Sequence, residues 1–315
     1  MELSEAAQKH FNDHNGDVSL IEMSHHLAAG MKTFMVQSWY FSMDEVRQSL
    51  GGAGYSLASG IAQLWIDGSS SATYEGTPVI LNQQSAKYLY KQLKAIEKDK
   101  TLKGVFTYMN DMQLLLKAKC SATNVTEFLS FKNLTRTLQT RAAFNLQKTW
   151  DFFKNPKIAM KVKANELYAT LEQKMVRSHI SYVMYQQALD YILNHRFTDD
   201  KIPELLLLMV KVFAVKQIML DTQPLYACGY FERGAKKLLD EAFTLVLAEL
   251  RPHMVPLTEA FTIDAQDFNV IGNKYGDIYE LQLETAKASR LNRTAVPPYY
   301  EKYMKPTMTM HKAKL

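Results

Sequence analysis

The pair in this sequence best suited to chemistry is a carboxylate followed by a glycine, Glu75-Gly76, within the segment Thr73-Tyr74-Glu75-Gly76-Thr77. Backbone geometry can hold a loop carboxylate against a ligand, and a glycine lets the chain approach that ligand closely. Burial against a substrate would raise the pKa of the carboxylate and make it a better general base. The alternative is a plain solvated loop, which is what most Glu-Gly pairs are.

A glycine-rich segment precedes this pair by about twenty residues and reads RQSLGGAGY over residues 47–55. Gly51 and Gly52 follow a run of helical spacing, and glycines just past the last turn commonly end a helix. The segment has no strand pattern before it, which excludes a dinucleotide-binding fingerprint of the strand–turn–helix type. Taken alone, it predicts a helix that stops at two glycines and leads into a loop.

The elements that would position these residues are helices. Residues 21–50 predict one long helix, and a loop over 54–73 with a short apolar piece at 61–66 follows it. A second helix is expected to start near Pro78 and to run to about residue 97. Beyond residue 100 the spacing predicts helices near 103–120, 124–153, 158–195, 203–220, 225–250 and 276–288, with loops near 155–156, 197–203 and 251–256. Because no alternating strand pattern of useful length is present, we predict an all-α protein.

The chain is long enough, at 315 residues, for one large domain or two smaller ones. We expect a helical bundle over 1–98 that carries both glycine-containing segments. A second helical domain is expected over 99–308, and an exposed tail over 309–315.

Composition excludes several classes of function. The 37 basic and 32 acidic residues are interspersed, so no nucleic-acid-binding arm is visible. The most apolar stretch, 205–215, is interrupted by Lys211 and is too short to span a bilayer, so no membrane insertion is expected. Cys120 and Cys228 match no metal-ligand spacing, and the histidines form no HExxH-type group, so we expect no metal site.

Taken together, the two segments resemble the acyl-CoA dehydrogenase and oxidase superfamily. The resemblance extends backward to residues 25–32, HHLAAGMK, and forward through residues 84–89, QSAKYL. Arg47, four places before the first glycine, favours the acyl-CoA oxidase branch. Residues 273–280, NKYGDIYE, with Pro298-Tyr299-Tyr300, resemble the closing segment of the oxidases. Residues 100–255 match by helical character only.

The resemblance implies FAD-dependent α,β-dehydrogenation of a fatty acyl-CoA, with oxygen reoxidising the flavin and hydrogen peroxide released. By motif position Glu75 would be the catalytic base, with Tyr74 and Gly76 beside the substrate, and Thr77 would contact the FAD of its own chain. The resemblance also implies a dimer, in which Gln48, Gly51 and Gly52 would contact the FAD of the partner subunit, and Arg47 could pair with a phosphate of the cofactor. A surface salt bridge explains Arg47 equally well.

This sequence departs from the oxidase pattern at several places. Ala53 stands where oxidases usually carry histidine, and Thr77-Pro78-Val79 stands where they carry Glu-Asn-Thr. The resemblance also covers the C-terminal half of the family only, so the N-terminal helical domain and the middle β-domain have no counterpart. Two hypotheses therefore stay open: an acyl-CoA oxidase or its base-bearing half, and a non-catalytic helical dimerisation partner of a full-length oxidase.

The terminal tripeptide Ala313-Lys314-Leu315 is of the small–basic–leucine type that the peroxisomal import receptor reads. Together with the oxidase resemblance, it predicts a peroxisomal protein. No secretory signal is expected, because the N-terminal residues are polar.

Overall fold

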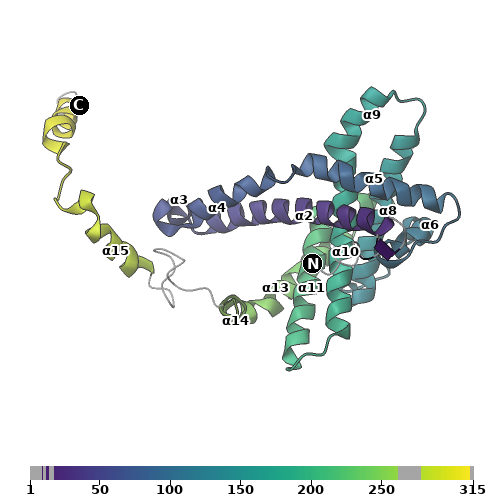
Figure 1. Cartoon of the computed structure of the whole chain (residues 1–315). Coiled ribbons are helices and arrows are strands. Elements are labelled where there is room, and N and C mark those ends of the chain that lie inside the picture. Colours follow the sequence, from purple (N-terminus) through teal and green to yellow (C-terminus); the bar gives the residue numbers. More distant parts are fainter. Residues whose placement is uncertain (1–8, 10–11, 14–17, 262–277, 313–315) are drawn as a thin grey trace. The chain divides into compact units, whose positions relative to one another are not determined.

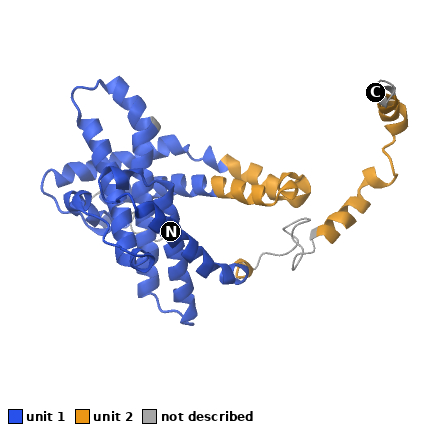
Figure 2. Ribbon diagram, turned by 180° about the vertical axis from the view of Figure 1, so that it is seen from behind, with its two compact units in different colours: residues 1–39, 71–257 blue, residues 40–70, 258–315 orange. Residues whose placement is uncertain are grey.

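The computed structural model describes residues 9, 12–13, 18–261 and 278–312, and these residues form helices and no strands. The all-α prediction is confirmed (Figure 1). The chain divides into two compact units, shown in different colours in Figure 2, and each is described by itself. Unit 1 comprises residues 1–39 and 71–257, and unit 2 comprises residues 40–70 and 258–315. The sequence-based division at residue 98 falls inside unit 1 and stays a prediction.

Long helices match the predicted ranges because their apolar positions repeat at helical spacing. The expected helix over 21–50 is α2 (Ser19–Ser49), and the helix expected from Pro78 is α5 (Pro78–Ile96), with proline in its first turn. The ranges 203–220 and 276–288 correspond to α11 (Lys201–Leu220) and α15 (Ile278–Ala288).

The core of unit 1 lies where α8 (Phe131–Lys154) and α10 (Glu172–Asn194) pack against each other, with α11 and α13 (Ala235–Leu250) beside them. Leucines of α8 and apolar side chains of α10 and α11 are fully buried there: Leu134, Leu138, Leu146, Met175, Ile180 and Ile218. Each such side chain contributes on the order of 1.5–3 kcal/mol by leaving water. This core fixes the helices on which α5 and the first half of α2 pack.

Several predicted single helices are interrupted. The range 103–120 begins as a 3₁₀ helix (Gly104–Asp111) and continues as the short α6 (Met112–Lys117). The range 124–153 is divided into α7 (Val125–Phe128) and α8, because the Ser130 hydroxyl accepts a bond from Asn133 N and starts a new helix.

Two more interruptions follow along the chain. The range 158–195 contains α9 (Met160–Glu166), a π-helix (Leu167–Leu171) and α10. The range 225–250 contains α12 (Gln223–Ala227) and α13, separated at Gly229, whose φ of 73° no helix accommodates. The predicted loop over 251–256 was wrong, because a 3₁₀ turn (Arg251–His253) and α14 (Met254–Glu259) occupy it.

The prediction of a loop over 54–73, most of which lies in unit 2, is wrong. The segment is mostly helical: α3 (Gly52–Tyr55), a 3₁₀ turn (Leu57–Ser59), α4 (Ile61–Ser69) and a second 3₁₀ turn (Ser70–Ala72). Its glycines and serines serve as caps. Ser56 accepts a bond from Ala58 N, and Gly60 adopts the left-handed conformation with φ 76° before α4. Further along, unit 2 contains α15, a π-helix (Tyr300–Met304) and α16 (Lys305–Lys312).

Candidate functional site

The Glu75 turn lies at the start of α5 in unit 1. Glu75 has φ 56° and Gly76 has φ 99°, so two consecutive residues adopt left-handed conformations. For Glu75 this conformation is uncommon and costs on the order of 1 kcal/mol, which the surrounding contacts must offset. Thr77 then returns to an extended conformation as the N-cap of α5, and Pro78 begins the helix.

Lys32, on α2, holds this turn in place. Its ammonium donates hydrogen bonds to the carbonyl of Tyr74 and, at 3.3 Å, to the carbonyl of Gly76. The same nitrogen lies 4.0 Å from a carboxylate oxygen of Glu75 and 5.3 Å from the centre of the Tyr74 ring. One cation therefore contacts three consecutive residues of the motif, and it gives the strained turn its compensating contacts.

The functional groups of the turn face outward. The Glu75 side chain is 78% exposed, and Tyr74 is 53% exposed. The Thr77 hydroxyl makes no capping bond to α5. Gly76 is favoured by its φ of 99°, and an added Cβ would lie 2.9 Å from a methyl group of Leu81, which would have to shift. The motif thus presents a carboxylate and a hydroxyl on a fixed backbone.

The glycine-rich segment lies in unit 2, at the end of α2. The Arg47 side chain donates to Asp44 Oδ1 from Nε at 3.0 Å and from Nη2 at 2.6 Å, and Gln48 donates to the other oxygen of Asp44 at 2.7 Å. The hydrogen bonds from Arg47, followed by that from Gln48, lower the pKa of Asp44. The Arg47 guanidinium also lies 5.4 Å from the centre of the Trp65 ring of α4. Arg47 is therefore engaged in the local ion pair that the sequence left open.

The glycines of this segment do different things. An added Cβ on Gly51 or Gly52 would meet no atom within 4 Å, so their backbone is uncovered. A Cβ on Gly54 would lie 1.7 Å from the carbonyl oxygen of Arg47, so only glycine fits where α3 turns back on α2. Gly51 has φ 57° and ends the long helix as predicted.

The structure places Tyr74, Glu75, Gly76 and Thr77 in one turn of unit 1, and Arg47, Gln48, Gly51 and Gly52 around the end of α2 in unit 2. The sequence did not assign a role to Lys32 or Asp44. Asp44 lies three residues before Arg47 and four before Gln48. Side chains at these spacings are neighbours on a helix, so the sequence could have indicated these bonds. The contact from Lys32 spans 42 residues along the chain and has no local signal.

Other sequence-based expectations concern sites of different kinds. In the part of the chain that the structure describes, no helix is both long and apolar enough to cross a membrane, and no three metal-ligating side chains gather. The tripeptide Ala313-Lys314-Leu315 and residues 273–277 of the closing segment lie outside the described residues.

Comparison with known proteins relates this geometry to a family. The family model for the acyl-CoA oxidase C-alpha1 domain matches residues 1–90, which contain both glycine-containing segments, and the acyl-CoA oxidase model matches residues 130–309. Peroxisomal acyl-coenzyme A oxidase 1 of Rattus norvegicus is 28% identical over 317 residues, which cover 92% of this chain and 45% of that protein. The chain thus spans about half the length of the curated relatives it matches.

Solved structures share the fold. Acyl-CoA oxidase 1 of Arabidopsis thaliana superposes with a TM-score of 0.87 at 20% identity, over 98% of this chain and 48% of that one. Acyl-CoA oxidase-2 of Caenorhabditis elegans, bound with FAD, ascaroside-CoA and ATP, has a TM-score of 0.83 at 23% identity, over 99% of this chain and 46% of that one. Since the oxidase model matches more than half of the residues, the chain belongs to the acyl-CoA oxidase family.

Proposed function

We propose that this chain carries the base-bearing helical part of an FAD-dependent acyl-CoA oxidase, with Glu75 as the base. The observation that carries the proposal is the fixed, outward-facing carboxylate of Glu75 in a strained turn that Lys32 holds. Strain of this kind persists only where surrounding contacts enforce it, and it is concentrated at functional sites. The family and the sequence around the turn indicate which reaction this carboxylate serves.

Two groups of residues support contact with FAD. The exposed Thr77 hydroxyl has no capping bond, and Gly51 and Gly52 present an uncovered backbone. Arg47 and Gln48 are bonded to Asp44, so they would contact a phosphate only by exchanging that partner. When bound, FAD would accept a hydride from the β-carbon of the acyl chain.

The chain's own contribution is proton transfer at the α-carbon. A carboxylate oxygen of Glu75 would take the α-proton of the acyl-CoA, and the turn would hold that oxygen in place while the substrate excludes water. In this chain the carboxylate is 78% exposed. Because a solvated carboxylate is a weak base toward a carbon acid, bound substrate and a covering surface must remove this water.

The experiment measures peroxide release from a long-chain acyl-CoA, with flavin absorbance as the binding readout. The chain is assayed alone and mixed with a full-length acyl-CoA oxidase that has lost its own base. We expect Glu75→Gln to abolish the activity of whichever preparation is active and to leave flavin absorbance intact. Glu166→Gln, the same change at an exposed site on α9, is the control. Activity that survives Glu75→Gln would remove Glu75 from the mechanism.

A second candidate function is a non-catalytic dimerisation partner of a full-length oxidase. It is favoured by large apolar side chains that unit 2 exposes, with Tyr55 at 84%, Leu57 at 67% and Phe41 at 62%. Exposed apolar side chains that lie together on a surface commonly mark a protein interface, and these three come from α2, α3 and the 3₁₀ turn that follows α3. If mixing raises the stability or activity of a full-length oxidase and Glu75→Gln has no effect on either, this function replaces the first.

We also propose that the chain works in the peroxisome and is imported through Ala313-Lys314-Leu315. The support is the form of the tripeptide and the name of the curated relatives, which are peroxisomal oxidases. A fluorescent protein fused before the last twelve residues is expected to enter peroxisomes. Replacing Leu315 by Asp should leave the fusion outside them, and import of both fusions alike would contradict the assignment.

A further inference from the structure

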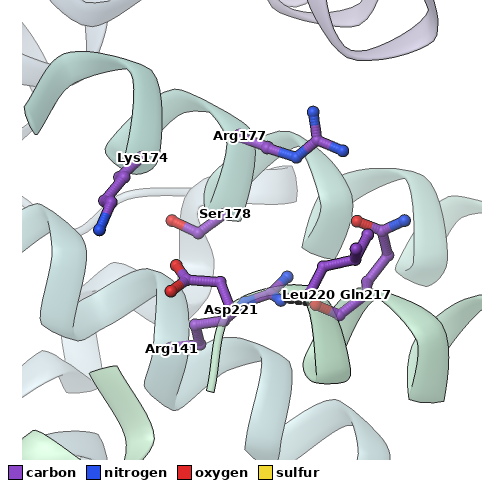
Figure 3. Close-up of a pocket in the computed structure, with 7 residues that line it drawn as sticks. All are labelled: Arg141, Lys174, Arg177, Ser178, Gln217, Leu220 and Asp221. Atoms are coloured by element: carbon purple, nitrogen blue, oxygen red, sulfur yellow. Dashed lines mark hydrogen bonds between the residues drawn. The ribbon is translucent and has the colours of Figure 1, made fainter. Parts of the chain in front are cut away.

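A cationic cavity lies between α8, α10 and the end of α11 in unit 1, away from the two glycine-containing motifs in the sequence (Figure 3). Its volume is about 270 Å³, enough for a small polyatomic ion with some water. Arg141 of α8, Lys174 and Arg177 of α10, and Asp221 after α11 supply its charged groups. Three cations therefore share the cavity with one carboxylate.

Arg141 is the buried member of this group. The residue is 3% exposed, and its guanidinium donates to the Gln217 carbonyl and, at 2.6 Å, to the Ser181 hydroxyl. Both acceptors are neutral, and Nε is buried without a hydrogen-bond partner. Burial lowers the pKa of Arg141 to about 10, so the guanidinium keeps its charge at neutral pH. A buried charge without a counter-ion is costly, and an anion that reaches it is strongly favoured.

Arg177 and Lys174 supply the other two cations of the cavity. Arg177 donates to Gln37 Oε1 at 3.2 Å and lies over the ring of Phe34, both neutral contacts. Among the residues that the structure describes, no carboxylate oxygen lies within 4.0 Å of Arg141, Lys174 or Arg177. The cations of the cavity are thus not neutralised by ion pairs within that part of the chain.

Asp221 is the acidic group at the cavity. Burial lowers the pKa of Arg177 as it lowers that of Arg141, and the charge of Asp221 opposes this shift at both arginines, so Asp221 is near them without forming an ion pair. Within the described chain its carboxylate also accepts no hydrogen bond, although its backbone nitrogen bonds to Ile218. A bound anion would bring a negative charge close to this carboxylate, so Asp221 opposes anion binding.

We propose that this cavity binds a phosphate group, either as inorganic phosphate or as the phosphate of a small metabolite. The cavity offers two guanidinium groups, whose donors lie in a plane, and one ammonium, which is a compact charge. Groups of both kinds bind tetrahedral oxoanions in proteins. The site shares no residue with the Glu75 turn, so phosphate binding can be measured without an oxidase assay. Bound phosphate would join α8 and α10 by ionic contacts with Arg141, Lys174 and Arg177.

The test is calorimetric titration of the 315-residue chain at fixed ionic strength with inorganic phosphate, pyrophosphate and ribose 5-phosphate, against chloride. We expect one site per chain. Tighter binding of the ester identifies a phosphorylated metabolite as the ligand, and tighter binding of the inorganic ions identifies the free ion. No heat beyond that of chloride for any of the three would overturn the proposal.

Variants locate the site. Arg177→Gln is expected to weaken phosphate about tenfold, as the loss of one charge-assisted hydrogen bond does, and Lys174→Gln about threefold because that side chain is more exposed. Asp221→Asn is expected to tighten binding at least about threefold. Lys132→Gln on the exposed face of α8 is the control and should change nothing. Equal effects of Lys132→Gln and Arg177→Gln would show a non-specific charge effect and refute the site.

Discussion

Two buried histidines, His26 of α2 and His179 of α10, predict a specific loss of stability in mild acid. Both are 0% exposed, and their rings lie 5.3 Å apart. His26 Nδ1 lies 2.9 Å from the Ser85 carbonyl, which can only accept, so this nitrogen carries the proton of the neutral ring. Tyr108 OH lies 2.8 Å from His179 Nδ1, and the Nε2 atoms of both rings are buried without partners. The charged form of either ring would thus carry an Nε2–H that is buried without an acceptor.

The magnitude follows from the pKa values. Burial lowers the pKa of His26 from 6.5 to about 4 despite the bond to Ser85, and it lowers that of His179 well below its usual value, with the charge of His26 as a smaller cause. The unfolded chain therefore binds more protons below about pH 6.5, so stability is full above that pH and is lost as pH falls toward 4. Between about pH 7.5 and pH 5, His26 alone accounts for a loss of roughly 2 kcal/mol.

The assay is urea unfolding of the chain at several pH values across this window. The slope near pH 5.5 is expected to be about 1.2 kcal/mol per pH unit from His26 alone, and steeper with the contribution of His179, which has the same sign. Asp44, Glu97 and Glu127 have lowered pKa values and titrate at more acidic pH, whereas burial raises the pKa of Glu172, so this carboxylate opposes the slope from the histidines. A flat stability between about pH 7.5 and pH 5 would refute the reasoning.

Variants test whether the pH dependence of stability comes from these histidines or from other groups of the chain. His26→Asn keeps a donor for Ser85 and removes the titrating nitrogen. The slope of stability against pH should then fall by about 1.2 kcal/mol per pH unit, the contribution of one proton, even if overall stability also falls. His253→Gln, at the exposed turn after α13, is the control and should keep the full slope. If His26→Asn does not fold, proton uptake on unfolding of the unaltered chain, measured by calorimetry in two buffers, gives the same number.

Two further changes test the segments on which the proposed function depends. Lys32→Met removes the bonds to the carbonyls of Tyr74 and Gly76. We expect stability to fall by about 1–2 kcal/mol and amide hydrogen exchange in that turn to become faster. Unchanged exchange would show that α5 holds the turn without Lys32. Gly54→Ala places a Cβ 1.7 Å from the Arg47 carbonyl oxygen. We expect stability to fall by about 2–4 kcal/mol and proteolysis between α2 and α4 to become rapid. A protease-resistant variant of normal stability would contradict the close approach.

Sequence alone predicted the long elements and missed the short ones for a physical reason. Helix α2 was predicted within two residues of its ends, because thirty residues of regular spacing outweigh local exceptions. The segment after Gly52 was predicted as a loop because it is rich in glycine and serine. In the structure the same residues cap successive short helices, as Ser56 and Gly60 do. Composition alone does not separate a cap from a loop.

The candidate site shows the same limit. The identity and the order of Tyr74, Glu75, Gly76 and Thr77 are local information, and the sequence was sufficient to nominate them. The role of Lys32 depends on the packing of α2 beside the start of α5, which is set by buried contacts such as that of His26 with Ser85. Long-range contacts of this kind have no periodic signature, so no single sequence indicates them.

The exposure of Glu75 separates two requirements that a catalytic carboxylate must meet. Position is supplied by this chain, since Lys32 and the left-handed conformations fix the backbone on both sides of the carboxylate. Desolvation is not supplied by the described residues, which leave 78% of the side chain in water. Since burial makes a carboxylate a stronger base, the proposed proton transfer requires that other groups cover the turn and exclude water. Lys32→Met and removal of the covering surface should therefore act differently: the first loosens the position of the base, and the second lowers its basicity.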